Sequence, residues 1–175
     1  MKRAHEWTLD LVQFLDDYRY QLSLTRKLDG LTAATAFDQD VVNEIVLWRL
    51  NRYSPLQPQA LQALNSLVGI AYKAHRQAGD TLLLLLQQPG VDLSMASALM
   101  RFRNPQAFQV IDRRAYRALS GHHFPLFATS GLQKKASLYF SYLDDLIAFS
   151  AARGIAFKDL DRILYVFDKE ENGAI

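Results

Sequence analysis

The chain has 175 residues, 50% of them apolar, so it is long enough to bury a core as one compact domain or two small lobes. Its formal net charge of +2 does not mark the whole surface as a nucleic-acid binder, although a local patch can be basic when the whole is not. The absence of cysteine excludes disulfides, thiolate zinc sites and cysteine-ligated iron–sulfur clusters.

Helical spacing of apolar residues begins near the amino terminus, where Trp7, Leu11, Phe14, Leu15 and Tyr18 predict an amphipathic helix. This region lacks the uninterrupted apolar segment of a signal peptide. The stretch LDGLTAATAFDQD interrupts the pattern. Asp40 is then predicted to cap a helix over residues 41–53, which ends before Ser54-Pro55.

Further helices are predicted along the rest of the chain. They cover residues 59–67, a segment through Tyr72 and His75, the leucine run 82–86, and residues 94–102, 113–119, 134–152 and 158–167. Gly79-Asp80 ends one helix and caps the next, and the tail KEENGAI is expected to fray. The leucine run is too short to span a bilayer and is interpreted as core. We therefore expect a soluble, cytoplasmic, all-α protein with no membrane partner.

A possible DNA-binding turn joins two of these helices at Pro89-Gly90-Val91-Asp92. Any helical hairpin can place a glycine at its turn, so the stretch is open to a purely structural interpretation. The alternative is a helix-hairpin-helix element, whose turn exposes backbone N–H groups that suit a DNA phosphate. Small residues such as Ala96 and Ala98 favour close packing of the two helices.

The segment of residues 80–119 resembles the helix-hairpin-helix DNA glycosylase superfamily, which includes endonuclease-III-like and adenine-glycosylase-like enzymes. The resemblance lies in Pro89-Gly90-Val91-Asp92, Ala96 and the acid in Val110-Ile111-Asp112-Arg113-Arg114-Ala115-Tyr116-Arg117. It implies a two-lobed bundle of about eight to ten helices, with one lobe from about residues 40–119 and the other from 1–39 plus 120–175. It also implies double-stranded DNA, damaged or modified, as partner.

The resemblance implies that Asp112 is the catalytic acid. Removing a base makes the sugar cationic in the transition state, and a carboxylate near C1′ stabilises that charge and orients or deprotonates water. The target base must first leave the stack and enter a pocket. Asp112 also precedes a predicted helix and is well placed as its N-cap, a role compatible with catalysis.

Two positions depart from the family pattern. Ser94 stands where bifunctional members carry a nucleophilic lysine, so we expect base hydrolysis without strand cleavage and without a cofactor. Asp92 replaces the second hairpin glycine. Its carboxylate can repel the phosphate, cap the next helix, or hold a cation that bridges to the phosphate. The hairpin contact to DNA is assigned to Gly90, Val91, Asp92 and Ser94.

Other candidate contacts come from two places. By alignment with the family, Asn51 matches the residue that fills the gap left by a flipped base, and Trp48 or Tyr53 could stack on a base, although an aromatic residue in an apolar helix is usually core. A local basic concentration consists of five arginines, Arg101, Arg103, Arg113, Arg114 and Arg117. The last three are the nearest to the acid. The arginines of this group can bind phosphate or pair with Asp144, Asp145 or Asp161.

His122-His123 could suggest a metal site, but adjacent loop histidines rarely share an ion and no third ligand is evident, so no metal is expected. Two other functions stay open beside that of a monofunctional glycosylase. The chain could be a helix-hairpin-helix DNA-binding protein that has lost catalysis, as Asp92 and the short chain would favour. It could also be a helical module whose arginines bind protein partners.

Overall fold

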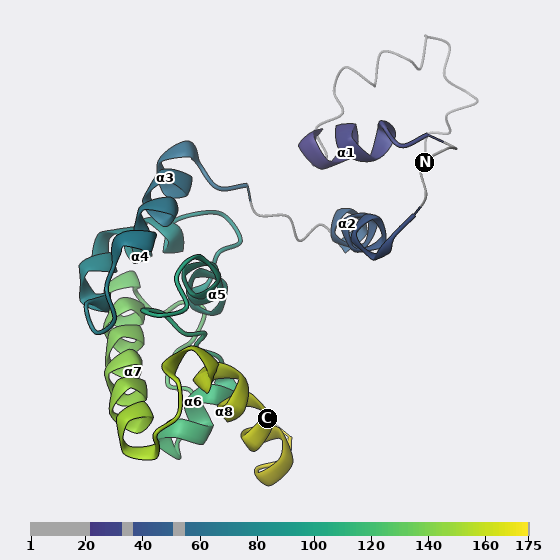
Figure 1. The fold of residues 1–175 in the computed structure, drawn as a ribbon. Helices are drawn as coiled ribbons and strands as arrows, with labels where there is room; N and C mark the ends of the chain where they lie inside the picture. The colour runs from purple at the N-terminus through teal and green to yellow at the C-terminus, as the bar shows by residue number, and fades with distance from the viewer. Residues whose placement is uncertain (1–21, 33–36, 51–54, 175) are drawn as a thin grey trace. The chain divides into compact units, whose positions relative to one another are not determined.

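The computed structural model describes residues 22–32, 37–50 and 55–174. Every regular element in these ranges is a helix, either α or a short 3-10 turn, and none of the described residues forms a strand. The prediction of an all-α protein is therefore confirmed. The chain divides into two compact units, Met1–Tyr53 and Ser54–Ile175 (Figure 1).

The described part of the first unit consists of α1 (Leu22–Asp29) and α2 (Gln39–Leu50). The predicted cap of the second helix was wrong: the backbone N–H of Val41 donates to Oδ1 of Asp38 over 2.9 Å, and Asp40 lies in the first turn of the helix. An acid in that turn still favours the helix, because it lies near the positive end of the helix dipole. The helix predicted around residues 7–18 lies outside the described residues.

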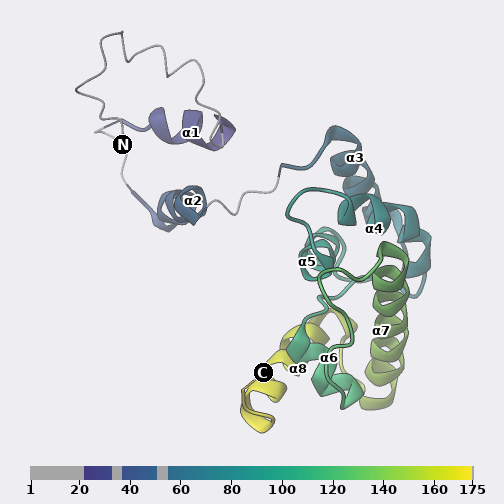
Figure 2. The same ribbon diagram turned by 180° about the vertical axis from the view of Figure 1, so that it is seen from behind.

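The described part of the second unit, residues 55–174, contains six α-helices, which are α3 (Pro58–Ser66), α4 (Gly79–Leu86), α5 (Leu93–Arg103), α6 (Arg113–Ser120), α7 (Leu132–Arg153) and α8 (Leu160–Glu171). The long helix α7 runs along one side, with α3 and α4 toward one end, α6 and α8 toward the other, and α5 between them (Figures 1 and 2). The chain therefore brings α4, α5 and α6 into one unit with α7.

A single apolar core fills this unit. Leu82 and Leu85 are fully buried, which confirms the leucine run as core. They belong to the same buried cluster as Met100 of α5 and Leu143 and Leu146 of α7. None of the helices in the described ranges is both long and apolar enough to cross a membrane.

The segment between α3 and α4 differs from the prediction. Instead of an α-helix through Tyr72 and His75, two 3-10 turns form, Leu67–Gly69 and His75–Ala78. The side chain of Asn104 donates from Nδ2 to the carbonyls of Leu67 and Ile70, each over 2.8 Å. Because these two carbonyls accept hydrogen bonds from a side chain, they do not need the backbone N–H partners that an α-helix would provide. The chain can therefore end the α-helix here without leaving them unpaired.

The start of α4 is a second correction. Asp80 was predicted to cap the leucine helix, but α4 begins at Gly79 and no side chain caps it. Asp80 lies inside the first turn instead. Its negative charge there still complements the N-terminal dipole of α4.

Candidate functional site

A cavity of about 650 Å³ opens on the second unit, where the α4–α5 hairpin, the start of α6, the loop after α6 and the start of α7 meet. Its lining consists of Gly90, Val91, Asp92, Leu93, Ser94, Ile111, Asp112, Arg113, Phe124, Leu126, Phe127, Ala128 and Lys135. The structure thus brings the predicted hairpin and the predicted acid, which are 18 or more residues apart in the chain, to one concave surface.

The hairpin turn depends on one glycine and one capping acid. Gly90 has a φ of 75°, in the left-handed region that glycine adopts without strain. Oδ1 of Asp92 accepts a hydrogen bond of 2.8 Å from the backbone N–H of Met95, so Asp92 is the N-cap of α5. Of the three roles considered for this residue, the cap is the one the structure shows. The N–H groups of Leu93 and Ser94, at the first two positions of α5, have no acceptor within their own helix.

Asp112 has one engaged and one open carboxylate oxygen. Its backbone is extended, and Oδ1 accepts a hydrogen bond of 2.8 Å from the backbone N–H of Ala115. The predicted capping role is therefore confirmed. Within the described ranges Oδ2 has no hydrogen-bond partner, and the half-buried side chain lines the cavity. The cap fixes the carboxylate in place and leaves one oxygen for a ligand.

Three side chains fix the extended segment that leads to Asp112. The hydroxyls of Tyr139 and Tyr142 on α7 donate to the carbonyls of Gln109 and Val110, each over 3.0 Å. Burial raises the pKa of the Tyr142 hydroxyl well above its usual value, and the charge of Asp112 raises it further. Tyr142 therefore stays protonated and remains a donor at any physiological pH.

The third fixing side chain is Ser97, which is fully buried in α5. Its hydroxyl donates to the carbonyl of Ser94 over 2.8 Å and accepts from the backbone N–H of Ile111 over 3.1 Å. The serine thus links the hairpin helix to the residue immediately before Asp112. This role of Ser97 was not predicted, because a small residue in a helix carries no signal of a contact 14 residues away.

We predict that Ser97→Ala lowers the free energy of unfolding by about 1–3 kcal/mol, because the buried N–H of Ile111 would lose its acceptor. Urea denaturation measures this change. Ser94→Ala is the matched control, since the Ser94 hydroxyl makes no hydrogen bond to a described residue. An unchanged unfolding midpoint in Ser97→Ala would show that the link does not stabilise the fold.

The arginines near the acid have different partners. Arg101 pairs with Asp161, with Nε 3.1 Å from Oδ2, and both side chains are nearly buried. This confirms that one of the arginines pairs with an acid named from the sequence. Arg103 donates to the carbonyl of Asn65 over 3.0 Å. Arg113, by contrast, is exposed and has no hydrogen bond or ion pair to any residue that the structure describes.

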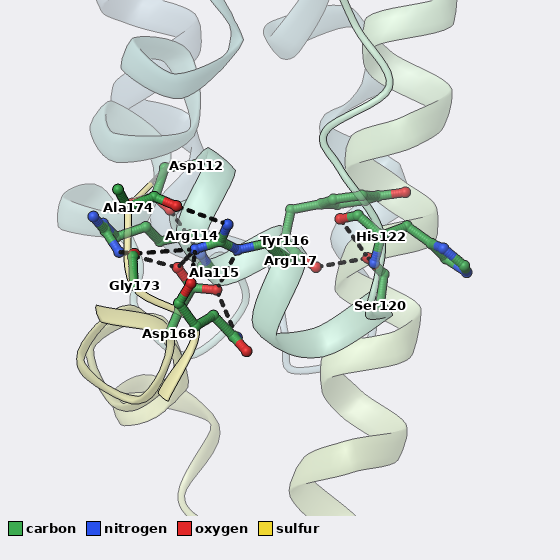
Figure 3. A network of polar contacts seen from close by, with 11 residues as sticks. Asp112, Arg114, Ala115, Tyr116, Arg117, Ser120, His122, Asp168, Gly173 and Ala174 are labelled. Atoms are coloured by element: carbon green, nitrogen blue, oxygen red, sulfur yellow. Dashed lines mark hydrogen bonds and ion pairs between the residues drawn. The ribbon is translucent and has the colours of Figure 1, made fainter. Parts of the chain in front are cut away.

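Arg114 and Arg117 form a clasp with Asp168 of α8 (Figure 3). Nε of Arg117 lies 2.8 Å from Oδ1 of this fully buried carboxylate, and Nη1 of Arg114 lies 3.2 Å from Oδ2. Hydrogen bonds from Arg117 lower the pKa of Asp168 to about 2, although burial alone would raise it. These two guanidinium groups therefore fasten α8 to α6.

The same two arginines hold the end of the chain. Arg117 donates to the carbonyls of Asn172, Gly173 and Ala174, and Arg114 to that of Gly173. The last helix accordingly runs to Glu171, beyond the predicted end at Phe167, so the first three residues of the predicted tail, 169–171, are helical. The sequence did not indicate this ending, because Asp168 and the tail carbonyls accept hydrogen bonds from Arg114 and Arg117, which lie 51 to 59 residues earlier in the chain.

The loop after α6 forms an apolar wall that the sequence analysis missed. The Phe124 ring packs edge-on against Tyr116, with centroids 5.4 Å apart, and Leu126 is buried. Phe127 is 80% exposed and stands at the edge of the cavity. Large apolar side chains within a Gly- and Ser-containing loop, as in HFPLF, were the signal that could have drawn attention to it.

Lys135 is a second lining residue that the sequence analysis missed. It reaches the cavity from the first turn of α7, and its Nζ donates to the carbonyl of Ala128 over 3.0 Å. With Arg113 it balances the charges of Asp92 and Asp112 among the lining residues. The neighbouring Lys134 is exposed and does not line the cavity.

The remaining candidates are Trp48, Asn51, Tyr53 and the two loop histidines. Trp48 is half-buried in the first unit, where its Nε1 donates to the hydroxyl of Thr25 over 2.9 Å. Asn51 and Tyr53 lie outside the described residues. His122 and His123 are exposed in the loop after α6, and the described part of the chain holds no group of three or more His, Asp or Glu side chains placed for a metal ion.

The cavity thus combines an apolar wall, a helix start with open N–H groups and a fixed carboxylate. An aromatic group could lie against the wall, while the carboxylate stabilises a neighbouring positive charge. Comparisons of the chain with protein-family models, with curated protein sequences and with solved structures found no match.

Proposed function

We propose that this protein is a monofunctional DNA glycosylase, which hydrolyses the bond between deoxyribose and a modified or mismatched base. The observation that carries the proposal is that the Gly90–Ser94 hairpin and the carboxylate of Asp112 line the same cavity. A turn that can bind the DNA backbone, beside a fixed acid, suits the removal of a base from a DNA strand.

The hairpin would bind the DNA backbone. The N–H groups of Leu93 and Ser94 can donate to a phosphate, whose negative charge is favoured at the start of a helix. Asp92 keeps its cap to Met95, which orients one carboxylate oxygen toward the helix itself. The extruded nucleotide would then enter the cavity, whose volume of about 650 Å³ falls in the range of small-molecule sites.

Asp112 would act on the sugar. As the bond from C1′ to the base nitrogen breaks, its electron pair leaves with the base, and positive charge develops on the sugar. The open Oδ2 of Asp112 can stabilise that charge and accept a proton from the attacking water, whose oxygen forms the new bond to C1′. The departing base takes up a proton, and no organic cofactor takes part.

The expected product is an abasic strand that breaks only on treatment with alkali. The hairpin position of the bifunctional lysine is Ser94, whose hydroxyl cannot form a Schiff base. Lys135 lines the cavity from another helix, and its Nζ is bonded to Ala128. A covalent adduct trapped with borohydride, and lost in Lys135→Gln but not in Lys134→Gln, would contradict the monofunctional mechanism.

A DNA-binding protein without catalysis is the second candidate, and one observation favours it. Asp92 is exposed, and it places a second carboxylate among the cavity-lining residues beside the proposed phosphate contact. Such a charge repels a phosphate at the cavity itself, where the reacting nucleotide would have to lie, so it disfavours catalysis there more than binding of the strand elsewhere. This candidate predicts binding that weakens with salt and releases no base from any oligonucleotide.

The deciding experiment is a screen of duplex oligonucleotides that each carry one altered or mismatched base, with alkali-labile breaks as the readout. Electrophoretic shifts over a range of salt concentrations run in parallel. Breaks at one class of base support the glycosylase. Salt-dependent binding without breaks supports the second candidate. An absence of DNA binding would refute both and leave a helical interaction module.

A further inference from the structure

A second, smaller hollow adjoins the cavity. It has a volume of about 270 Å³ and is lined by Arg113, Arg117, His123, Phe124, Leu126 and Phe127. Arg113 and the three apolar residues line both hollows. A group bound in the second hollow would therefore lie directly beside the occupant of the first.

The charges of the two hollows differ. The cavity has Asp92 and Asp112 in its lining, whereas the polar residues that line the second hollow are Arg113, Arg117 and His123, with no carboxylate among the described residues that line it. The charge of Arg117 is offset by its pair with Asp168, which does not line the hollow. Arg113 supplies the uncompensated positive charge, and the His123 ring lies in the same lining.

The arginines of α6 face different surroundings: two of them face α8, whereas Arg113 is exposed. Arg114 and Arg117 both bind Asp168 on α8. Arg113 precedes them at the first position of α6 and has no partner in the described part of the chain. A planar guanidinium with five free donors is well suited to bind two oxygens of one phosphate.

We propose that the second hollow is a phosphate subsite, in which Arg113 and His123 bind the phosphodiester next to the extruded nucleotide. This proposal rests on the proposed function for the identity of the ligand, but its chemistry does not depend on catalysis. Asp112 and Arg113 are adjacent in the sequence, so the sugar and its neighbouring phosphate would meet adjacent side chains. The wall of Phe124 and Phe127 would lie between base and phosphate.

Binding of a duplex that contains one tetrahydrofuran abasic analogue tests the subsite. We expect Arg113→Gln to weaken binding about tenfold, as for loss of a charge-assisted hydrogen bond, and to lower the salt slope by about one. His123→Asn should also weaken binding, because it removes an imidazole N–H donor from the lining of the second hollow. The matched controls, Arg162→Gln and His122→Asn, remove exposed side chains outside both hollows and should bind as the unmodified protein does.

Inorganic phosphate is the second probe, and its binding is monitored by the NMR signals of the His122 and His123 rings. Phosphate should shift the signals of His123 but not those of His122, and the shift should disappear in Arg113→Gln. Duplexes with and without a 5′-terminal phosphate distinguish a terminal phosphomonoester from an internal phosphodiester as the preferred ligand. Equal affinity for the two supports the internal group, and a preference for the terminal phosphate overturns that assignment.

The two probes separate the subsite from the glycosylase. Base release that persists with unchanged DNA affinity in Arg113→Gln and His123→Asn would overturn the subsite and leave the glycosylase standing. Phosphate-dependent shifts of His123 in a protein that releases no base would support the subsite and count against the glycosylase. Phosphate shifts of equal size at both histidines would overturn the subsite.

Discussion

Asp112→Asn is expected to slow base release by about 10²- to 10⁴-fold, the usual contribution of a positioned acid or base, without lowering the melting temperature. Asparagine caps a helix about as well as aspartate, so the bond from the N–H of Ala115 persists. The variant therefore removes the charge and preserves the fold of α6. Single-turnover release of the base from a duplex, measured with enzyme in excess, gives the chemical rate directly.

Asp92→Asn is the matched control, because Asp92 also caps a helix and also lines the cavity. It should keep base release and bind DNA more tightly, since it removes a carboxylate beside the phosphate. A rate in Asp112→Asn equal to that of the unmodified protein would remove Asp112 from the mechanism. An equal loss in both variants would show that the net charge of the cavity matters and that no single acid does.

Asp112→Ala adds a second effect that can be measured separately. It removes the cap as well as the charge, and loss of an N-cap costs about 1 kcal/mol. Its melting temperature should therefore fall, while that of Asp112→Asn does not. The difference in melting temperature between the two variants measures the contribution of the cap to stability. The loss of base release that both variants share measures the contribution of the charge to chemistry.

Local patterns in the sequence were enough to place the hairpin and the acid. The glycine turn at Gly90 and the capping positions of Asp92 and Asp112 depend on residues within three positions of each other. Helical periodicity likewise depends on neighbours, which is why the all-α class and the leucine core were predicted correctly. What these features share is that their contacts are close in the chain.

The features that the sequence did not reveal depend on distant contacts. The wall of Phe124 and Phe127 becomes part of a site only because the loop after α6 returns to the hairpin. The 3-10 turn Leu67–Gly69 is bonded to Asn104, whose side chain reaches back 37 residues to Leu67. Local sequence patterns contain no information about such contacts between distant parts of the chain.

The arginines illustrate the same limit. Five of them within 17 residues suggested a basic patch, yet the structure gives four of them partners within the protein. Their partners belong to α8, to the tail and to the end of α3, all far away in sequence. Charge density along a chain therefore overestimates the charge available to a ligand, and Arg113 is the arginine of this group that remains.

The clasp at Asp168 is where the largest loss of stability is expected. Asp168→Asn would leave two guanidinium groups with no carboxylate, and breaking a buried ion pair by removing one partner is strongly destabilising. We expect the melting temperature to fall on the order of 10 °C. Glu171→Gln, at an exposed position of the same helix, is the control and should change it little. An unchanged melting temperature in Asp168→Asn would show that the clasp does not hold α8.

Acid titration tests the same clasp without a mutation. The pKa of Asp168 in the folded protein is about 2, below its ordinary value of 3.8, so the ionised carboxylate favours the folded state. This contribution is complete above about pH 4 and is lost as the pH falls through about 2. Urea denaturation at a series of pH values should therefore show a steeper acid loss of stability in the unmodified protein than in Asp168→Asn. Parallel curves for the two proteins would mean that other carboxylates cause the acid unfolding.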